Sequence, residues 1–237
     1  RIGIPDGDPH TDYARVPRPA ASGYARVDRA AYSCVVDLGG PSPSYNPGHA
    51  HCDALSFVAT VHGRPLFVDP GVTTYERGRK RDRERSTVSH NTVQVDQAEQ
   101  SEIWDVFRVG RRAAVTVDRC DEGELRASHD GFLPLGARHV RRFRFGDSAV
   151  TIDDEIAESY EGAATVRFHL HPAVVAAVDG PTVRLNGCTI GFPTGAGPRL
   201  ERYEYSDGFN RPVEATVVEC TFEKRMQTVI TITDEAS

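Results

Sequence analysis

The chain has 237 residues, of which 39% are hydrophobic and 26% charged, a balance that predicts a soluble globular protein. This length is enough for one large domain, or two small ones, with a core of its own. The net charge of -6 and the pI of about 5.9 argue against nucleic acid or an anionic membrane as the main partner.

The five cysteines are scattered and form no CxxC pair, which argues against a disulfide framework and against a cysteine zinc site. No apolar run approaches the roughly 20 residues that a helix needs to cross a bilayer. The sequence opens with RIGIPDGDPHTD, which has neither a Met nor a signal peptide, and this start indicates a segment of a longer protein.

Residues 1–21 are rich in Pro, Asp and Arg and predict a linker or lead-in, while residues 22–237 predict one domain. Short runs rich in Val, Thr, Phe and Tyr, separated by Gly, Asp or Asn, predict strands in that domain. We expect strands at 23–28, 32–38, 54–61, 65–69, 91–96, 105–109, 112–118, 124–129, 138–145, 148–156, 163–170, 173–178, 182–185, 188–192, 199–205, 214–222 and 226–233. No window has a long 3.6-residue period, so the sequence predicts an all-β, antiparallel β-sandwich without substantial helix.

Three connections stand out in this pattern. FGDSAV (145–150) and LNGCTI (185–190) are typical of tight hairpin turns. The basic run ERGRKRDRER (76–85) predicts a solvated loop, and the alternative is a binding loop for an acidic ligand.

The segment PGHAHCDALSFVATVHGRPLFVDPG (47–71) places polar residues where a strand is expected. If residues 49–61 are extended, His49, His51 and Asp53 share a face with the apolar residues that follow. Buried polar groups are costly unless they are paired or bind a metal. The segment therefore predicts either a satisfied polar cluster or a metal site.

Histidine and carboxylate ligands suit zinc and related divalent ions, and the ligands that the residues favour are His51, Asp69 and His90. A two-residue turn at His62-Gly63 would place Asp69 opposite Ser56, roughly 17 Å of extended chain from His51. The site therefore requires a bend near residues 52–54 or a longer hairpin loop.

Two other metal-binding motifs fit less well. A binuclear metallohydrolase of the metallo-β-lactamase type would need a histidine where Ala54 stands. A cupin would need a glutamate where Leu55 and Ser56 stand.

Four blocks occur in order: NPGHAHCDALSF, GRPLFVDPGVTTY, RSTVSHNTVQVDQAEQSEIW and SHDGF. Together they resemble the C-terminal β-sandwich of heparinase II/III-type polysaccharide lyases, from about residue 22 to about residue 175, with a less distinctive continuation. Members of that family join an N-terminal (α/α) toroid to this sandwich. They cleave uronic-acid polysaccharides such as heparan sulfate and alginate by β-elimination.

The resemblance implies a role for six residues. His49 matches the family's catalytic histidine, while His51, Asp69 and His90 match the ligands of a structural zinc ion. Tyr75 and Arg85 lie near the family's substrate-cleft loop. A secreted, periplasmic or cell-envelope location is also implied.

The same resemblance implies that a tyrosine and a carboxylate-neutralising Asn or His come from the toroid, which this chain lacks. We therefore expect an acidic polysaccharide and a helical domain of the same protein as partners, and little activity from this chain alone. The alternatives are a non-catalytic module that binds acidic glycans and a purely structural sandwich.

Overall fold

The computed structural model describes residues 22–41, 47–156 and 160–233, so the predicted lead-in at 1–21 lies outside the described residues. Its largest sheet has eight antiparallel strands. Their order is β13 (Ala176–Asp179), β14 (Thr182–Leu185), β15 (Cys188–Gly191), β18 (Arg225–Ile232), β11 (Ala149–Ile156), β10 (His139–Phe145), β9 (Glu124–His129) and β8 (Val115–Cys120).

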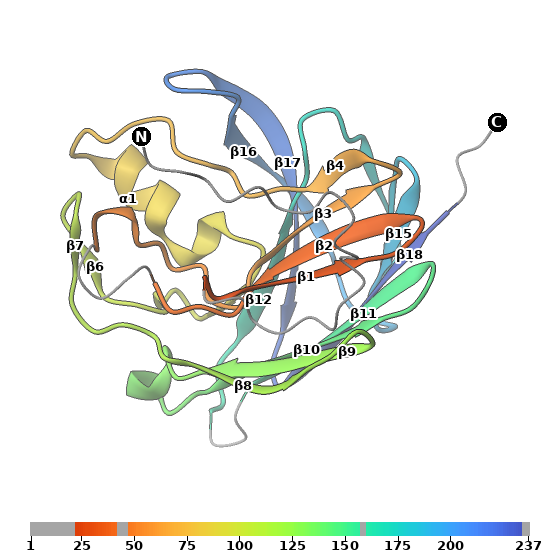
Figure 1. Ribbon diagram of the computed structural model, residues 1–237, viewed down its shortest axis with the longest axis horizontal. Helices are drawn as coiled ribbons and strands as arrows, with labels where there is room; N and C mark the ends of the chain where they lie inside the picture. Colours follow the sequence, from red (N-terminus) through yellow and green to blue (C-terminus); the bar gives the residue numbers. More distant parts are fainter. Residues whose placement is uncertain (1–21, 42–46, 157–159, 234–237) are drawn as a thin grey trace, which may run out of the picture.

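Two four-stranded antiparallel sheets form the facing layer. One has the order β1 (Tyr24–Asp28), β2 (Tyr32–Asp37), β3 (Phe57–Val61) and β4 (Arg64–Phe67), and the other β16 (Arg199–Ser206), β17 (Pro212–Phe222), β12 (Ala164–His169) and β5 (Val93–Val95). A single bridge between Phe67 and Leu170 links β4 to the end of β12. Figure 1 shows β1 to β3 lying over β8 to β10, as expected for a sandwich.

Four phenylalanines hold the layers together. The ring of Phe57 on β3 lies 5.5 Å from that of Phe67, 5.7 Å from that of Phe143 and 6.0 Å from that of Phe168. These partners lie on β4, β10 and β12, so one side chain contacts the three larger sheets. Tilted and edge-on aromatic pairs at such distances add to the free energy gained by burial. The start of β3 is therefore fixed at the centre of the core.

The predicted strands and tight turns are confirmed, with changes at their ends. The 105–109 run is split, because Asp105 has φ of 58° and lies in the turn between β6 (Ile103–Trp104) and β7 (Arg108–Val109). His62 and Gly63 form the expected two-residue turn, with positive φ at both positions. A β-bulge between Ala59 and Thr60 shifts the β3–β4 register.

The prediction of a solvated loop at 76–85 is wrong. Residues Arg79–Arg85 form the helix α1, and its Arg81 and Arg85 are among the most buried side chains of the described chain. The two arginines are four residues apart and therefore share one helix face, which points inward. In Figure 1, α1 lies at one end of the sandwich with β6 and β7. The other helical segments described are single 3₁₀ turns: η1 (Pro47–His49), η2 (Thr87–Ser89) and η3 (Leu133–Leu135).

The eight-stranded sheet carries polar groups on its buried face. Arg141 on β10 lies directly opposite Asp154 on β11, and both are fully buried. The guanidinium donates from Nε to Oδ1 at 2.7 Å and from Nη2 to Oδ2 at 3.0 Å. His139 contacts the same Oδ1 at 2.7 Å, and His129 on β9 contacts His139 at 3.2 Å. A chain of polar side chains thus crosses three adjacent strands.

These buried groups make the stability depend on pH. Burial lowers the pKa of His129 and His139, so both stay neutral in the fold while their unfolded counterparts take up protons below about pH 6.5. Burial opposes the charge of Asp154, but Arg141 and His139 lower its pKa to about 2. The unfolded state therefore binds more protons than the fold on acidification, from about pH 6.5 for the histidines and from about pH 4 for Asp154.

We expect the free energy of unfolding to fall as the pH drops below about 6.5, by up to about 1.4 kcal/mol per pH unit for each of the two histidines. Denaturant unfolding between pH 4.5 and 8 measures the slope. The double variant His129→Gln, His139→Gln should have a shallower slope because it lacks both proton sites. An equal slope in the two proteins would show that these histidines are not the source.

Candidate metal and catalytic site

The His-x-His-x-Asp segment is bent, so residues 49–61 do not form one extended run. His49 ends the 3₁₀ turn η1, and β3 begins only at Phe57. The bend comes at Leu55, which has φ of 61°, while Ser56 N–H donates to the Asp53 carbonyl at 2.9 Å. A left-handed leucine is strained by roughly 1–2 kcal/mol, so other contacts must hold it. This bend satisfies the condition that the sequence set for bringing Asp69 near His51.

His90 lies at the centre of the site. It is 1% exposed, and its Nδ1 lies 2.7 Å from Oδ2 of Asp69. Its Nε2 is also buried and has no hydrogen-bond partner among the described residues. Buried ring nitrogens without a partner are rare because the desolvation is not repaid. The ring is therefore anchored on one side by a carboxylate and open to a ligand on the other.

Two more groups lie close to His90. Ligand atoms of His51, Asp53 and His90 lie within 4.8 Å of one another, and the His51 and His90 ring centroids are 5.2 Å apart. The structure thus groups two of the three predicted metal ligands, His51 and His90, with Asp53, while Asp69 contacts Nδ1 of His90 and is not a member of this group. Asp53 is a further candidate ligand that the sequence analysis noted on the same face but left out of the metal set.

The charged groups at this cluster shift one another's pKa. Burial opposes a positive His90, but the carboxylates of Asp69, Asp53 and Asp37 together raise its pKa. Burial, with the nearby positive charges of His90 and Arg81, lowers the pKa of His51 to about 3, so this imidazole is neutral. A neutral imidazole has a free lone pair, which a metal requires.

The carboxyl groups differ from one another. The side chain of Asp69 is 44% exposed; partial burial opposes its charge, but His90 overcomes this and holds the Asp69 pKa below its ordinary value. Burial raises the pKa of Asp53, and burial with the charge of Asp53 raises the pKa of Asp37 to about 8. The raised pKa values of Asp53 and Asp37 indicate that negative charge is disfavoured there without a further cation.

The SHNT sequence at 89–92 ties this cluster to three strands. Asn91 donates its amide to the carbonyls of Phe57 at 2.8 Å and Val68 at 2.9 Å, and its Oδ1 accepts from the N–H of His169 at 2.6 Å. Thr92 donates its hydroxyl to the Ala54 carbonyl at 2.9 Å. The side chain of Asn91 therefore fixes the backbone beside His90 to β3, to the end of β4 and to β12.

His49 lies apart from this cluster, on the surface. Its exposed ring is edge-on to Tyr75 at 5.9 Å, and Tyr75 is 41% exposed. The guanidinium of Arg81 lies 4.9 Å from the Tyr75 ring centroid, and its Nη1 is 3.4 Å from Nε2 of His51. Arg81 thus contacts both Tyr75, which lies beside His49, and His51 of the cluster. The sequence analysis missed it because 76–85 was expected to be a loop; the i, i+4 spacing of Arg81 and Arg85 was the available signal.

Arg85 is buried beneath the same surface. It donates from Nε to the Ala50 carbonyl at 2.9 Å, and from Nη1 to the carbonyls of Asp105 at 2.7 Å and Val106 at 2.9 Å. Its Nη2 reaches the carbonyl of Arg108 at 3.4 Å. Arg85 therefore joins the loop that bears His49 to the β6–β7 hairpin.

That hairpin extends the surface beside His49. Phe107 stacks on Tyr75 at 6.4 Å, and the guanidinium of Arg108 lies 4.8 Å from the ring of Trp104. Phe107 is 52% and Trp104 49% exposed. Exposed aromatic rings beside arginines form a surface suited to binding.

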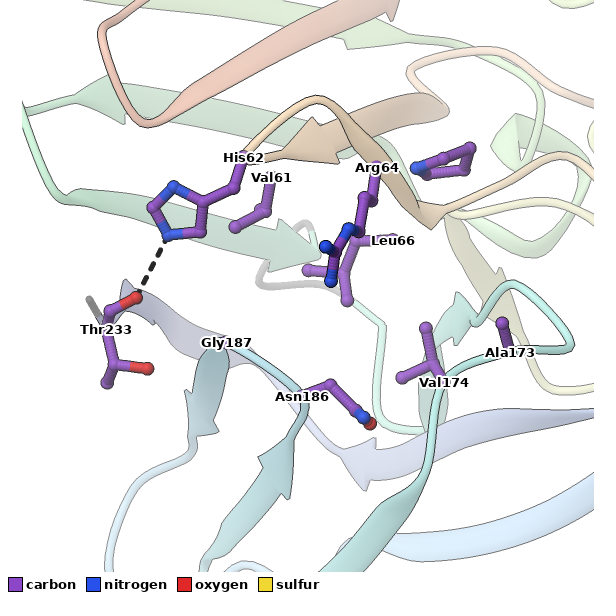
Figure 2. Close-up of a pocket in the computed structure, with 10 residues that line it drawn as sticks. Val61, His62, Arg64, Leu66, Ala173, Val174, Asn186, Gly187 and Thr233 are labelled. Carbon is purple, nitrogen blue, oxygen red and sulfur yellow. Dashed lines mark hydrogen bonds between the residues drawn. The ribbon is translucent and has the colours of Figure 1, made fainter. Parts of the chain in front are cut away.

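A separate pocket of about 560 Å³ lies at the β3–β4 hairpin (Figure 2). His62 donates to the Thr233 carbonyl at 3.0 Å at its rim, and Asn186 lines its floor. None of its described lining residues belongs to the histidine cluster.

A family model described as "Heparinase II/III-like, C-terminal" matches residues 13–233. The chain belongs to this family. Among solved structures, the heparinase III BT4657 gene product is 19% identical, with a TM-score of 0.72, over 90% of this chain and 35% of its own. The heparan sulfate lyase HepC from Pedobacter heparinus is 16% identical, with a TM-score of 0.70, over 91% of this chain and 36% of its own.

A more distant likeness is to the chondroitin AC lyase of Streptomyces coelicolor, which is 11% identical, with a TM-score of 0.53, over 90% of this chain and 32% of its own. At these identities the likeness shows the fold of the heparinase II/III-like domain. The domain spans about a third of the length of these structures. No curated protein sequence matches the chain.

Within the described residues, no helix has the length and apolar character that a membrane crossing requires.

Replacing Arg85 by Met should lower the free energy of unfolding by at least about 2 kcal/mol, because carbonyls of two loops lose their donor at once. Denaturant unfolding and amide hydrogen exchange at residues 105–108 measure the effect. The matched control is Arg77→Met: Arg77 pairs with the Asp105 side chain at 2.8 Å but is 79% exposed, so its loss should cost less than about 1 kcal/mol. Equal losses in both variants would contradict the role given to Arg85.

Proposed function

We propose that this heparinase II/III-like domain supplies one wall of the active site of a polysaccharide lyase, which cleaves uronic-acid-containing glycans by β-elimination. The observation that carries the proposal is the separation of two histidines only two residues apart. His49 is exposed beside Tyr75, while His51 turns toward the buried His90. One position is suited to a substrate and the other to an ion.

The ion site is part of the proposal. A divalent ion, zinc by preference, would be held by His51, His90 and either the predicted Asp69 or Asp53, since Asp69 already contacts Nδ1 of His90 whereas Asp53 is the carboxylate grouped with both histidines. The fit rests on the partnerless buried Nε2 of His90, the neutral imidazole of His51 and the carboxyl group of Asp53 beside both. Such an ion would cross-link the bent segment to the strands around it, a structural role.

His49 is suited to the proton steps. β-Elimination removes the proton at C5 of the uronate, and the O4 leaving group is protonated. An imidazole titrates near neutrality and serves either step. The bend at Leu55 and the Arg85 bond to the Ala50 carbonyl hold the loop on which His49 stands. Tyr75, edge-on to His49, limits the directions in which that imidazole can turn.

The surface around His49 supports an acidic sugar as ligand. Tyr75, Phe107 and Trp104 are exposed rings on which sugar rings can pack, and Arg108 beside Trp104 supplies positive charge. The same surface favours the alternative of a module that binds acidic glycans without chemistry. Turnover by the intact protein distinguishes the two.

One wall is not sufficient for the reaction. Abstraction of the C5 proton, protonation of O4 and neutralisation of the carboxylate need groups placed around the sugar within roughly 3 Å of their targets. The remaining groups, including a tyrosine, would come from a helical domain of the same protein. We therefore propose that the 237-residue chain alone has little activity.

Protein prepared without added metal should contain about one equivalent of a divalent ion, measured by elemental analysis. His51→Ala should lose the ion and lower the melting temperature, since the segments that the ion joins are no longer cross-linked. The control is His62→Ala, which removes a histidine from the β3–β4 turn and should keep the ion. Unchanged metal content in His51→Ala would refute the ligand assignment.

In the intact protein, His49→Ala should reduce formation of the unsaturated uronate by at least about 100-fold, because a proton-transfer group is lost. The product is followed by its ultraviolet absorbance, and the metal content should not change. Loss of the ion in this variant would mean that His49 and His51 have each other's roles. Full lyase activity from the 237-residue chain alone would contradict the half-site proposal.

A further inference from the structure

We propose that Arg141 is a positioning residue for the ion cluster: held by a buried chain of hydrogen bonds from Gly131 through His129, His139 and Asp154, it fixes the backbone beside Asp53 and His90. The consequence for metal binding rests on the proposed function; the positioning of the backbone does not. This series of hydrogen bonds also gives a role to the SHDGF block at 128–132, which has none in the proposed function.

The direction of the hydrogen bonds is set at the SHDGF end. The N–H of Gly131 can only donate, and it lies 3.1 Å from Nδ1 of His129, which must accept. A neutral His129 then carries its proton on Nε2 and donates it to Nδ1 of His139 at 3.2 Å. A neutral His139 in turn carries its proton on Nε2 and donates it to Asp154 at 2.7 Å. Each ring therefore has one tautomer and one orientation.

Glycine is required at position 131, where this series of hydrogen bonds begins. A Cβ at position 131 would lie 2.5 Å from the backbone oxygen of Gln100 and 3.0 Å from Nδ1 of His129. Real side chains do not approach backbone so closely, so any other residue would move the N–H away from the ring. The geometry of the loop after β9 is thus passed directly to His129.

Asp154 orients Arg141, and Arg141 in turn contacts the backbone of the site. Its Nε and Nη2 bind the two carboxylate oxygens of Asp154, which fixes the plane of the guanidinium. The remaining amino group, Nη1, donates to the Leu55 carbonyl at 2.9 Å and to the Asn91 carbonyl at 2.7 Å. The two protons of one nitrogen thus join the two segments that form the ion cluster.

The carbonyls of Leu55 and Asn91 lie close in sequence to Asp53 and His90. Leu55 is the strained residue of the bend, two positions after Asp53, and Asn91 directly follows His90. A displacement of either carbonyl would change the separation between Asp53 and His90, which share the 4.8 Å group. Lysine cannot replace this arginine, because a single ammonium cannot grip a carboxylate with two bonds and also reach both carbonyls.

The placement is not explained by stability alone. A buried ion pair gives little net stability, and apolar side chains of similar size often replace it without loss. Neighbouring positions on the same face, such as Phe143 and Ile152, are apolar. Arg141 and Asp154 form a charged pair beside these apolar neighbours. The N–H groups of Arg141 that do not contact Asp154 are directed at the carbonyls of Leu55 and Asn91. This arrangement fits a role in positioning those two segments.

The test uses the 237-residue chain with zinc as the probe. Arg141→Lys should weaken zinc binding about 10- to 100-fold in chelator competition, the range found when residues that support metal ligands are changed. Arg142→Lys is the matched control: this neighbouring arginine points to the opposite face, pairs with Glu124 and is 42% exposed. Its zinc affinity should equal that of the unchanged chain.

A second readout does not require the metal. The proton between His90 Nδ1 and Asp69 is expected to give a separate downfield NMR signal in the metal-free chain. Arg141→Lys should shift or broaden this signal, and Arg142→Lys should not. If the unchanged chain binds no zinc, the proposed ion site fails, and only this signal tests the inference. An identical signal in the two variants would then overturn the inference.

A third variant separates positioning from stability. His139→Leu, Arg141→Met and Asp154→Leu together replace the charged chain by apolar groups and should keep the fold, checked by its melting temperature. The two carbonyls then have no guanidinium, so zinc affinity should fall and the His90 signal should change, as in Arg141→Lys. A folded triple variant with unchanged zinc affinity and an unchanged His90 signal would overturn the inference.

Discussion

The bond between Arg141 and Asp154 is the constraint on which the site depends. A guanidinium enclosed in a core must have a partner for its charge and acceptors for its N–H groups, because water cannot reach it. The carboxylate across the strand provides the first, and the carbonyls of Leu55 and Asn91 provide the second. The sheet and the irregular loops above it are therefore one connected structure, although no strand pairing joins them there.

The irregular loops gain from this connection a shape that a regular strand could not provide. In an extended strand, His49 and His51 would point the same way. The 3₁₀ turn at His49 and the bend at Leu55 direct one ring outward and the other inward. Two chemical environments are thus created within three residues, one exposed beside Tyr75 and one beside the buried His90 and the carboxyl group of Asp53.

Much of the fold could be read from the sequence, because strands with alternating burial and Gly- or Asn-containing turns are local signals. The histidine and aspartate ligands could be proposed for the same reason, since their types limit the chemistry. The helix α1 was missed because its inward face consists of Arg81 and Arg85, which a hydrophobic pattern does not detect. The bend at Leu55 was recognised only as a requirement, since contacts from Asp37 and Arg141, far away in sequence, hold it.

The buried pair itself left a signal that was not used. A tight turn was predicted within residues 145–150, and counting outward from its observed position at 146–148 places Arg141 opposite Asp154. Both lie in the same alternation as neighbouring Phe and Ile residues, so both should face inward. A charge pair in register on the apolar face of a hairpin is a pattern that periodicity and turn position can reveal together. The contacts to Leu55 and Asn91, however, depend on how the layers pack and cannot be counted from the sequence.

Arg85 holds the hairpin beside His49 entirely through main-chain oxygens, those of Ala50, Asp105, Val106 and Arg108. Every amino acid presents the same carbonyl, so this anchor does not depend on which side chains the hairpin carries. The exposed residues Trp104 and Phe107 can therefore be exchanged during evolution while the backbone that displays them keeps its course. A surface built in this way can change what it recognises without rebuilding its support.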